Sequence, residues 1–325
     1  MIYWADIWIA VLSGCGIAMA AGLVLGLVGP VSMRPLRKVS PGVRSVILVL
    51  SALAPVIAGI LGAKLVAWSP HALPFDLVSH HCHADLAICS SHARAENTVL
   101  LIALGAGTLG ALIVWIAHSL FDLVSQSTQS QRLLRAASSL RNGRASRLVT
   151  DRIVAVSAGL LRPRIFLSEG LVKRLDRSDV EVVIAHEAAH GQRRDSIIRL
   201  LVSVFSLGHL PHMKTRLLAE LELAQEQICD RAAAKAFGAV PTAETLLKVE
   251  RLRHSLGGES LPLSTAFDHS DIEARTRALV APDFGLTRPA VIIFSCLLMI
   301  GALALLVAAE PVHHEIESFF LSLQN

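Results

Sequence analysis

The sequence predicts a mainly α-helical membrane protein, with four transmembrane helices and a cytoplasmic α+β domain that contains a small β-hairpin or sheet. Composition is the first observation behind this fold class: 53% of the 325 residues are hydrophobic and only 17% are charged. Soluble domains carry about a quarter charged residues, so an ordinary soluble protein is excluded. The apolar residues also gather into four long segments, and most basic residues lie between the third and the fourth.

The four apolar segments are each long enough to cross a bilayer, which takes about 20 residues. They cover approximately residues 7–28, 46–68, 98–120 and 290–309. We therefore divide the chain into four parts, which are a three-span membrane region (1–120), a cytoplasmic domain (121–289), the fourth span (290–309) and a short outer tail (310–325).

The positions of lysine and arginine predict the orientation in the membrane. The loop after the first span holds four of them, and the segment 121–289 holds 24 of the 30. Basic loops stay on the cytoplasmic side, so we expect a multi-pass protein of the bacterial inner (cytoplasmic) membrane with both termini outside. No recognition motif accompanies the basic residues, so they indicate topology and contact with membrane lipid rather than direct nucleic-acid binding.

Within the cytoplasmic segment, local patterns predict several short elements. Residues 132–147 are typical of a basic amphipathic helix, and residues 153–156 and 164–167 of two strands in a hairpin. A short helix is expected over 170–175. The apolar stretch 197–210 is too short to span a bilayer and predicts a core or interfacial helix.

A histidine pair is the most informative feature of this segment. Ser178 and Glu181 form a capping-box pattern, which predicts that a helix begins there. His186 and His190 are four residues apart on that helix, so their imidazoles lie on one face. Glu187 lies beside them, which completes an H-E-x-x-H pattern.

This spacing points to metal chemistry. Two imidazoles at positions i and i+4 can bind one zinc ion at about 2.0–2.1 Å, and the glutamate of the pattern acts as a general base. Burying two histidines and a glutamate on an apolar helix without a metal would be costly. The pattern therefore predicts a zinc-dependent metalloendopeptidase with one catalytic zinc ion.

A catalytic zinc site needs a third protein ligand, and a second helix over about 215–237 offers candidates. Glu226 and Asp230 share one face of that helix; we expect Glu226 to bind the metal and Asp230 to orient a histidine. Glu222, one turn earlier, is the alternative ligand.

Asp195 follows His190 by five residues. On a continuous helix its side chain would point about 140° away, so it is not expected to share the metal. We expect Asp195 and Arg193 to contact the metal ligands without binding the metal themselves.

These motifs resemble the BlaR/MecR-type integral-membrane metallopeptidases. The resemblance rests on Pro163–Ser168, Gly170-Leu171, His186-Glu187-x-x-His190-x-x-Arg193-x-Asp195 and Glu226-x-x-Cys229-Asp230. It implies a gluzincin-like domain in which His186, His190 and Glu226 bind zinc and Glu187 is catalytic. It also implies three spans, a cytoplasmic protease domain and a fourth span.

The resemblance further implies an antirepressor role, in which a protein substrate, a transcriptional repressor or other regulatory protein, is cleaved in signal transduction. Only about 16 residues follow Ala309, so we expect no penicillin-binding sensor domain for β-lactams. Residues 269–279, with Arg275, resemble a late motif of HtpX-type proteases, although Ser270 replaces their proline.

Two alternatives stay open from the sequence. One is HtpX-like quality control of membrane proteins, and the other is a non-enzymatic membrane metal sensor. The outer loop 69–97 bears on the second, because Cys82 and Cys89 could form a disulfide, or could bind a metal together with His80, His81 and His83. For the protease, the strand near 165–168 is the expected site where an extended substrate adds by β-augmentation.

Overall fold

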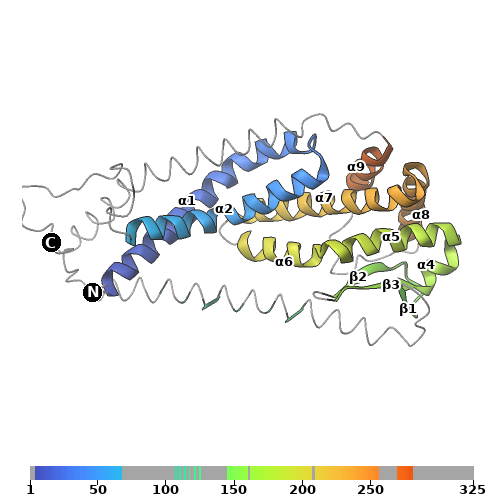
Figure 1. The fold of residues 1–325 in the computed structure, drawn as a ribbon, viewed down its shortest axis with the longest axis horizontal. Helices are drawn as coiled ribbons and strands as arrows, with labels where there is room; N and C mark the ends of the chain where they lie inside the picture. Colours follow the sequence, from blue (N-terminus) through green and yellow to red (C-terminus); the bar gives the residue numbers. More distant parts are fainter. Residues whose placement is uncertain are drawn as a thin grey trace, which may run out of the picture.

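The computed structural model describes residues 4–67, 145–159, 162–206, 209–255 and 269–280, together with isolated positions between 107 and 125. These residues form a mostly helical structure with one small mixed sheet (Figure 1). The helices and the sheet agree with the predicted fold class. The third and fourth predicted spans and the outer loop 69–97 lie outside the described residues, so their structure stays a prediction.

The first two predicted spans are helical. Helix α1 covers Trp4–Leu36 and α2 covers Pro41–Ala67, and the two lie side by side (Figure 1). Gly14 and Gly59 allow the close approach, because a Cβ atom on Gly14 would lie 2.7 Å from the Gly59 carbonyl oxygen. Within α2, the stretch Pro41–Lys64 is long and apolar enough to cross a membrane. The apolar stretch in α1 is shorter, so its crossing stays a prediction.

The sheet contains three strands in the order β1-β3-β2. Strand β2 (Ala155–Ala158) pairs antiparallel with β3 (Arg164–Ser168), which confirms the predicted hairpin. Strand β1 (Ala145–Leu148) pairs parallel with β3. The helix predicted over 132–147 was therefore wrong at its C-terminal end. The basic stretch 145–148 forms an edge strand instead, and Leu148 of that strand is buried.

Two helices follow β3 directly. Helix α4 (Glu169–Arg174) begins at Ser168, whose hydroxyl oxygen accepts a hydrogen bond from the Leu171 amide at 3.2 Å. Helix α5 (Arg177–Arg193) begins one residue before Ser178, with Asp176 at the N-cap. The predicted capping box was therefore wrong, because the chain turns into the helix two residues earlier.

Four further helices complete the described fold. They are α6 (Asp195–Phe205), α7 (Pro211–Phe237), α8 (Ala239–Ser255) and α9 (His269–Val280). Helix α7 ends before Gly238, as predicted, but begins four residues earlier than predicted because a proline stands in its first turn. Helix α6 ends five residues before the predicted limit and is too short to span a bilayer.

Helix α7 lies between α2 on one side and α5 on the other (Figure 1). A core cluster joins Leu48 and Ala52 of α2 to Leu217 and Leu221 of α7, with Val202 of α6 beside them. A second cluster packs the sheet against α4, α5 and α8. The first cluster thereby fixes the near half of α7 against α2, and α7 also contacts α5, which carries the histidine pair.

Candidate metal centre

Helix α5 presents His186, Glu187 and His190 toward a cavity. Val182 and Val183 on the same helix are buried, which sets the rotation of the helix. The two imidazole rings lie edge to face with their centres 4.9 Å apart. Their side chains are nearly buried, with 15% of His186 and 10% of His190 exposed. The site is therefore shielded but open to a small ligand.

Helix α7 places Glu226 opposite the two histidines. One carboxylate oxygen lies 3.3 Å from His186 Nε2 and the other 3.2 Å from His190 Nε2. The two Nε2 atoms are 3.2 Å apart. The two Nε2 atoms and the two oxygens of the Glu226 carboxylate thus converge on the wall of the cavity.

The other nitrogen of each ring contacts a buried carboxylate. His186 Nδ1 lies 3.0 Å from Asp230 Oδ1, and His190 Nδ1 lies 2.8 Å from Asp195 Oδ2. An acid at each Nδ1 favours the tautomer that carries its hydrogen on Nδ1, which would leave the Nε2 lone pair for a metal ion.

Asp195 reaches His190 because the helix does not continue. Arg194 adopts a left-handed conformation with φ 55°, which ends α5 and starts α6 in a new direction. The expectation that Asp195 points away was wrong, since it assumed an unbroken helix. Arg193 Nε lies 3.3 Å from the second Asp195 oxygen and supports its charge.

Arg275 of α9 is the residue whose role the sequence did not reveal. It binds Asp230 through two hydrogen bonds of 2.8 Å, from Nε and Nη2. Its Nη1 also lies 3.1 Å from Glu226 Oε2. A buried guanidinium thus neutralises part of the carboxylate charge around the histidines. The resemblance of 269–279 to a late protease motif was the one signal that could have indicated it.

These charges shift the pKa values of the site. Burial alone would raise the pKa of Glu226, but Arg275 and His190 outweigh it and hold that pKa well below its usual value. Burial would lower the pKa of His190, but Glu226 and Asp195 raise it well above the ordinary value. Glu226 therefore stays ionised near neutral pH, as a carboxylate ligand must be, while a metal ion would have to displace a proton from His190.

Cys229 lies close to His190 and Asp195, so these three residues form a second group whose ligand atoms are near one another. Its sulfur lies 3.6 Å from Asp195 Oδ2. Burial raises the pKa of the thiol to about 11, so it stays protonated at neutral pH. A protonated thiol is a poor ligand, which favours the first group as the metal site.

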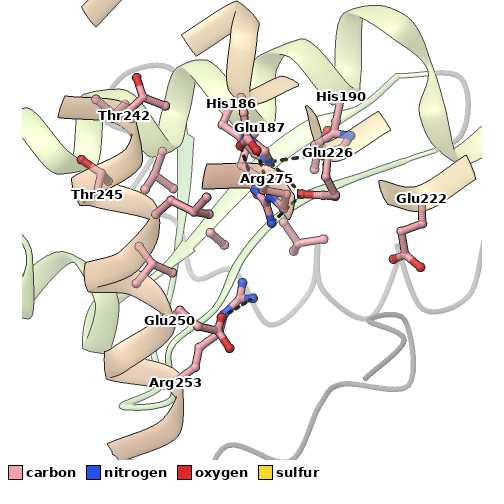
Figure 2. A pocket seen from close by; sticks show the side chains of 18 of the residues that line it. His186, Glu187, His190, Glu222, Glu226, Thr242, Thr245, Glu250, Arg253 and Arg275 are labelled. Carbon is pink, nitrogen blue, oxygen red and sulfur yellow. Dashed lines mark hydrogen bonds and ion pairs between the residues drawn. The ribbon is translucent and has the colours of Figure 1, made fainter. Parts of the chain in front are cut away.

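The metal-facing side chains line a cavity of about 160 Å³ (Figure 2). Glu187 is 8% exposed and lies beside His186 in this cavity. Glu222 lies away from the three ligand atoms, and its carboxylate contacts Arg199 at 3.5 Å. The alternative in which Glu222 binds the metal therefore has no support in this geometry.

Strands and helix α8 form the remaining walls of the cavity. Residues 155–157 of β2 line one side, and Thr242, Thr245, Leu246 and Val249 line the other. Strand β3 is central and is paired on both sides, so the expectation that a substrate adds at 165–168 was wrong. Strand β2 is the edge strand that faces the cavity. Cys82, Cys89, His80, His81 and His83 lie outside the described residues.

The comparisons agree with the motifs described above. The BlaR1 peptidase M56 family matches residues 76–279, which include α5, α7 and α9. No curated protein and no solved structure matches the chain. Since the family match covers more than half of the sequence and contains the whole candidate site, this chain belongs to the BlaR1 peptidase M56 family of metallopeptidases.

Proposed function

We propose that this chain is a zinc-dependent metalloendopeptidase in which His186, His190 and Glu226 bind one zinc ion and Glu187 is the general base. Its substrate is a cytoplasmic or membrane-bound regulatory protein, of which a transcriptional repressor is the leading class. The observation that carries the proposal is the convergence of two imidazole nitrogens and the Glu226 carboxylate, with contacts of 3.2–3.3 Å between them.

The spacing of these groups fits zinc. In a tetrahedral site with ligands at about 2.0–2.1 Å, two neighbouring ligand atoms are about 3.3–3.4 Å apart. The two Nε2 atoms are 3.2 Å apart, and each lies 3.2–3.3 Å from an oxygen of Glu226, so two nitrogens and a carboxylate, which are ordinary zinc ligands, lie close to that spacing. Three protein ligands leave the fourth position free, as catalysis requires.

The acids behind the histidines strengthen the fit. Asp230 and Asp195 hold each ring in the tautomer that presents Nε2, and their charge raises the basicity of the ring. A non-enzymatic metal sensor would need the ligands but would not need Glu187, which contacts the same cavity.

The chemistry can then be assigned to residues. Zinc, when bound, supplies Lewis acidity toward water and the scissile carbonyl. Glu187 takes a proton from the attacking water and delivers it to the leaving amine. The nearly buried position of Glu187 protects that proton from exchange with bulk solvent during transfer.

An extended segment of substrate is the form that this site accepts. Strand β2 offers edge hydrogen-bonding groups beside the metal centre, so a peptide can add there as a further strand. Leu246 and Val249 of α8 then provide an apolar wall for one of its side chains. This arrangement replaces β3 by β2 as the substrate strand.

For the cellular setting, we keep the topology that the charge distribution predicts. The protein lies in the bacterial inner membrane with four spans, a cytoplasmic protease domain and both termini outside. The apolar stretch Pro41–Lys64 supports one of these spans. Membership of the family supports association with a membrane.

The test compares the wild type with Glu187→Ala, both purified in detergent, for zinc content and for cleavage of fluorescein-labelled casein. We expect one zinc ion per chain in both proteins and cleavage by the wild type alone, with a loss of at least about 100-fold for a missing general base. Glu181→Ala is the matched control, since Glu181 lies on the same helix outside the cavity. Absence of zinc from both proteins would overturn the assignment.

Crosslinking in cells that produce Glu187→Ala separates the two protease roles. Recovery of a DNA-binding repressor supports signalling. A broad set of misfolded membrane proteins would favour quality control instead.

A further inference from the structure

A buried polar contact connects α2 to the metal centre through α7 and α9. Arg44 of α2 donates a hydrogen bond of 2.6 Å from Nη2 to the Oε1 atom of Gln227. Gln227 in turn donates from Nε2 to the Ala274 carbonyl oxygen of α9 at 3.1 Å. Gln227 is the residue directly after Glu226, and Ala274 directly precedes Arg275. Gln227 and Ala274 are therefore each one residue away from a residue of the site.

The chemistry of the two partners determines what Gln227 must be. Arginine only donates hydrogen bonds, and a backbone carbonyl only accepts them. A side chain between them must accept at one end and donate at the other, and the amide of glutamine does both in one orientation. Neither a carboxylate nor an apolar side chain of the same length satisfies both partners.

This contact and Arg275 attach α9 to α7 at adjacent positions. Arg275 binds the two acids of the site, while Gln227 holds the backbone from which Arg275 extends. If the backbone at Ala274 shifts, the guanidinium shifts with it. Glu226 and Asp230 would then lose part of the charge that stabilises them.

Burial adds weight to the contact. Arg44 is 1% exposed and Gln227 is 5% exposed. Among the described residues, Arg44 Nε has no hydrogen-bond partner, so the guanidinium carries a desolvation cost that an apolar residue would avoid. Burial of the Arg44 charge near the start of the apolar helix α2 costs free energy. This cost points to a role for Arg44 other than filling space in the core.

We propose that Arg44 and Gln227 are positioning residues for the metal centre: together they hold α9 so that Arg275 remains on Glu226 and Asp230. The inference rests on the proposed zinc site. It implies that the start of α2, which is the candidate membrane span, contributes to the geometry of the ligands.

The test uses the full chain in detergent, four single variants and one double variant. Gln227→Met removes the contact with little change in side-chain length, Arg44→Met removes it with a shorter apolar side chain, and Arg44→Lys keeps a donor. Glu220→Gln is the comparison variant: it breaks the ion pair with Arg37, a second link to α7 from the same region of the chain, and leaves both hydrogen bonds of Gln227 in place. Zinc affinity is measured by competition with a chromophoric chelator, and ligand geometry by the visible spectrum of the Co²⁺-loaded protein.

Loss of a carboxylate that orients a zinc ligand costs about 10- to 100-fold in metal affinity. The contact of Arg44 and Gln227 acts on the ligands only through neighbouring residues, so its loss should have a smaller effect. We therefore expect zinc to bind about three- to tenfold more weakly in Gln227→Met and in Arg44→Met, with an altered cobalt spectrum. Arg44→Lys should restore most of the affinity. The double methionine variant should be no weaker than either single variant, because both remove the same contact.

Several results would overturn the proposal. Wild-type affinity and an unchanged cobalt spectrum in Gln227→Met would refute it, while the zinc site itself would stand. An equal loss in Glu220→Gln would show general loosening of the helices, and the thermal unfolding midpoint of each variant identifies that case. A wild-type chain that binds neither metal would instead refute the proposed function.

Discussion

Removal of the Asp195 carboxylate should weaken zinc binding without removing a ligand. Asp195 is 1% exposed and accepts a hydrogen bond of 2.8 Å from His190 Nδ1. A hydrogen bond to a charged group contributes about 1.5–3 kcal/mol, and about 1.4 kcal/mol corresponds to a factor of ten. We therefore expect Asp195→Ala to bind zinc about 10- to 100-fold more weakly than the wild type.

Asp195→Asn should lie between the two proteins. Its amide oxygen can still accept the hydrogen of His190 Nδ1, but the negative charge is gone. A neutral hydrogen bond contributes about 0.5–1.5 kcal/mol, so about 1–1.5 kcal/mol is lost and affinity should fall about 5- to 12-fold. The order wild type, Asn, Ala separates the effect of charge from that of the hydrogen bond.

The assay is zinc competition with a chromophoric chelator at one fixed pH in detergent. Asp179→Asn provides the control, since Asp179 is a buried acid of α5, the helix of His190, and contacts Thr245 and Lys248 rather than a histidine. Equal affinities in wild type and Asp195→Ala would refute the role of this carboxylate. A comparable loss in Asp179→Asn would show that removal of a buried carboxylate without a histidine contact has the same effect.

Three further predictions concern stability, and each is measured by unfolding of the detergent-solubilised chain. Burial would raise the pKa of Asp179, but its hydrogen bond to Lys248 outweighs this and the pKa lies below the usual value. The stabilising contribution of Asp179 is thus fully present above the unfolded pKa of about 3.9 and disappears as pH falls through the folded pKa, so the deficit of Asp179→Asn at pH 7 should shrink below about pH 3.9 and vanish below the folded pKa; a constant deficit would contradict this. Phe166→Ala should cost about 3–5 kcal/mol, because Phe166 is fully buried in the sheet; a cost below about 1 kcal/mol would show that the strand packing is wrong. Gly59→Val should lower the midpoint, since any Cβ there would lie 2.7 Å from the Gly14 carbonyl oxygen; an unchanged midpoint would mean that α1 and α2 do not pack here.

The hydrophobic periodicity of the sequence and its turn and cap residues are sufficient to predict the presence of α5, the end of α7 and the β2–β3 hairpin. Those features depend on neighbours in the chain, such as Gly238 after the last turn of α7. The i and i+4 spacing of His186 and His190 likewise follows from the helix alone. Local information therefore accounts for one face of the candidate site.

The remaining features depend on contacts between distant segments. The helix break at Arg194 cannot be predicted from the sequence, because nothing in the sequence marks a non-glycine residue that adopts the left-handed conformation. Strand β1 exists because β3 offers it an edge, although its sequence is also compatible with a helix. Arg275 reaches Asp230 across 45 residues of chain, and no spacing rule connects the two.

The position of α7 has a practical consequence for the study of this enzyme. Met213, Leu217 and Leu221 are completely or almost completely buried, and the cluster they form includes Leu48 of α2. A fragment that begins after the third predicted span would expose this apolar surface on the same helix that carries Glu226, and would be expected to aggregate. Inhibitor screens and crystallisation should therefore use the chain with α1 and α2 attached, in detergent or in nanodiscs.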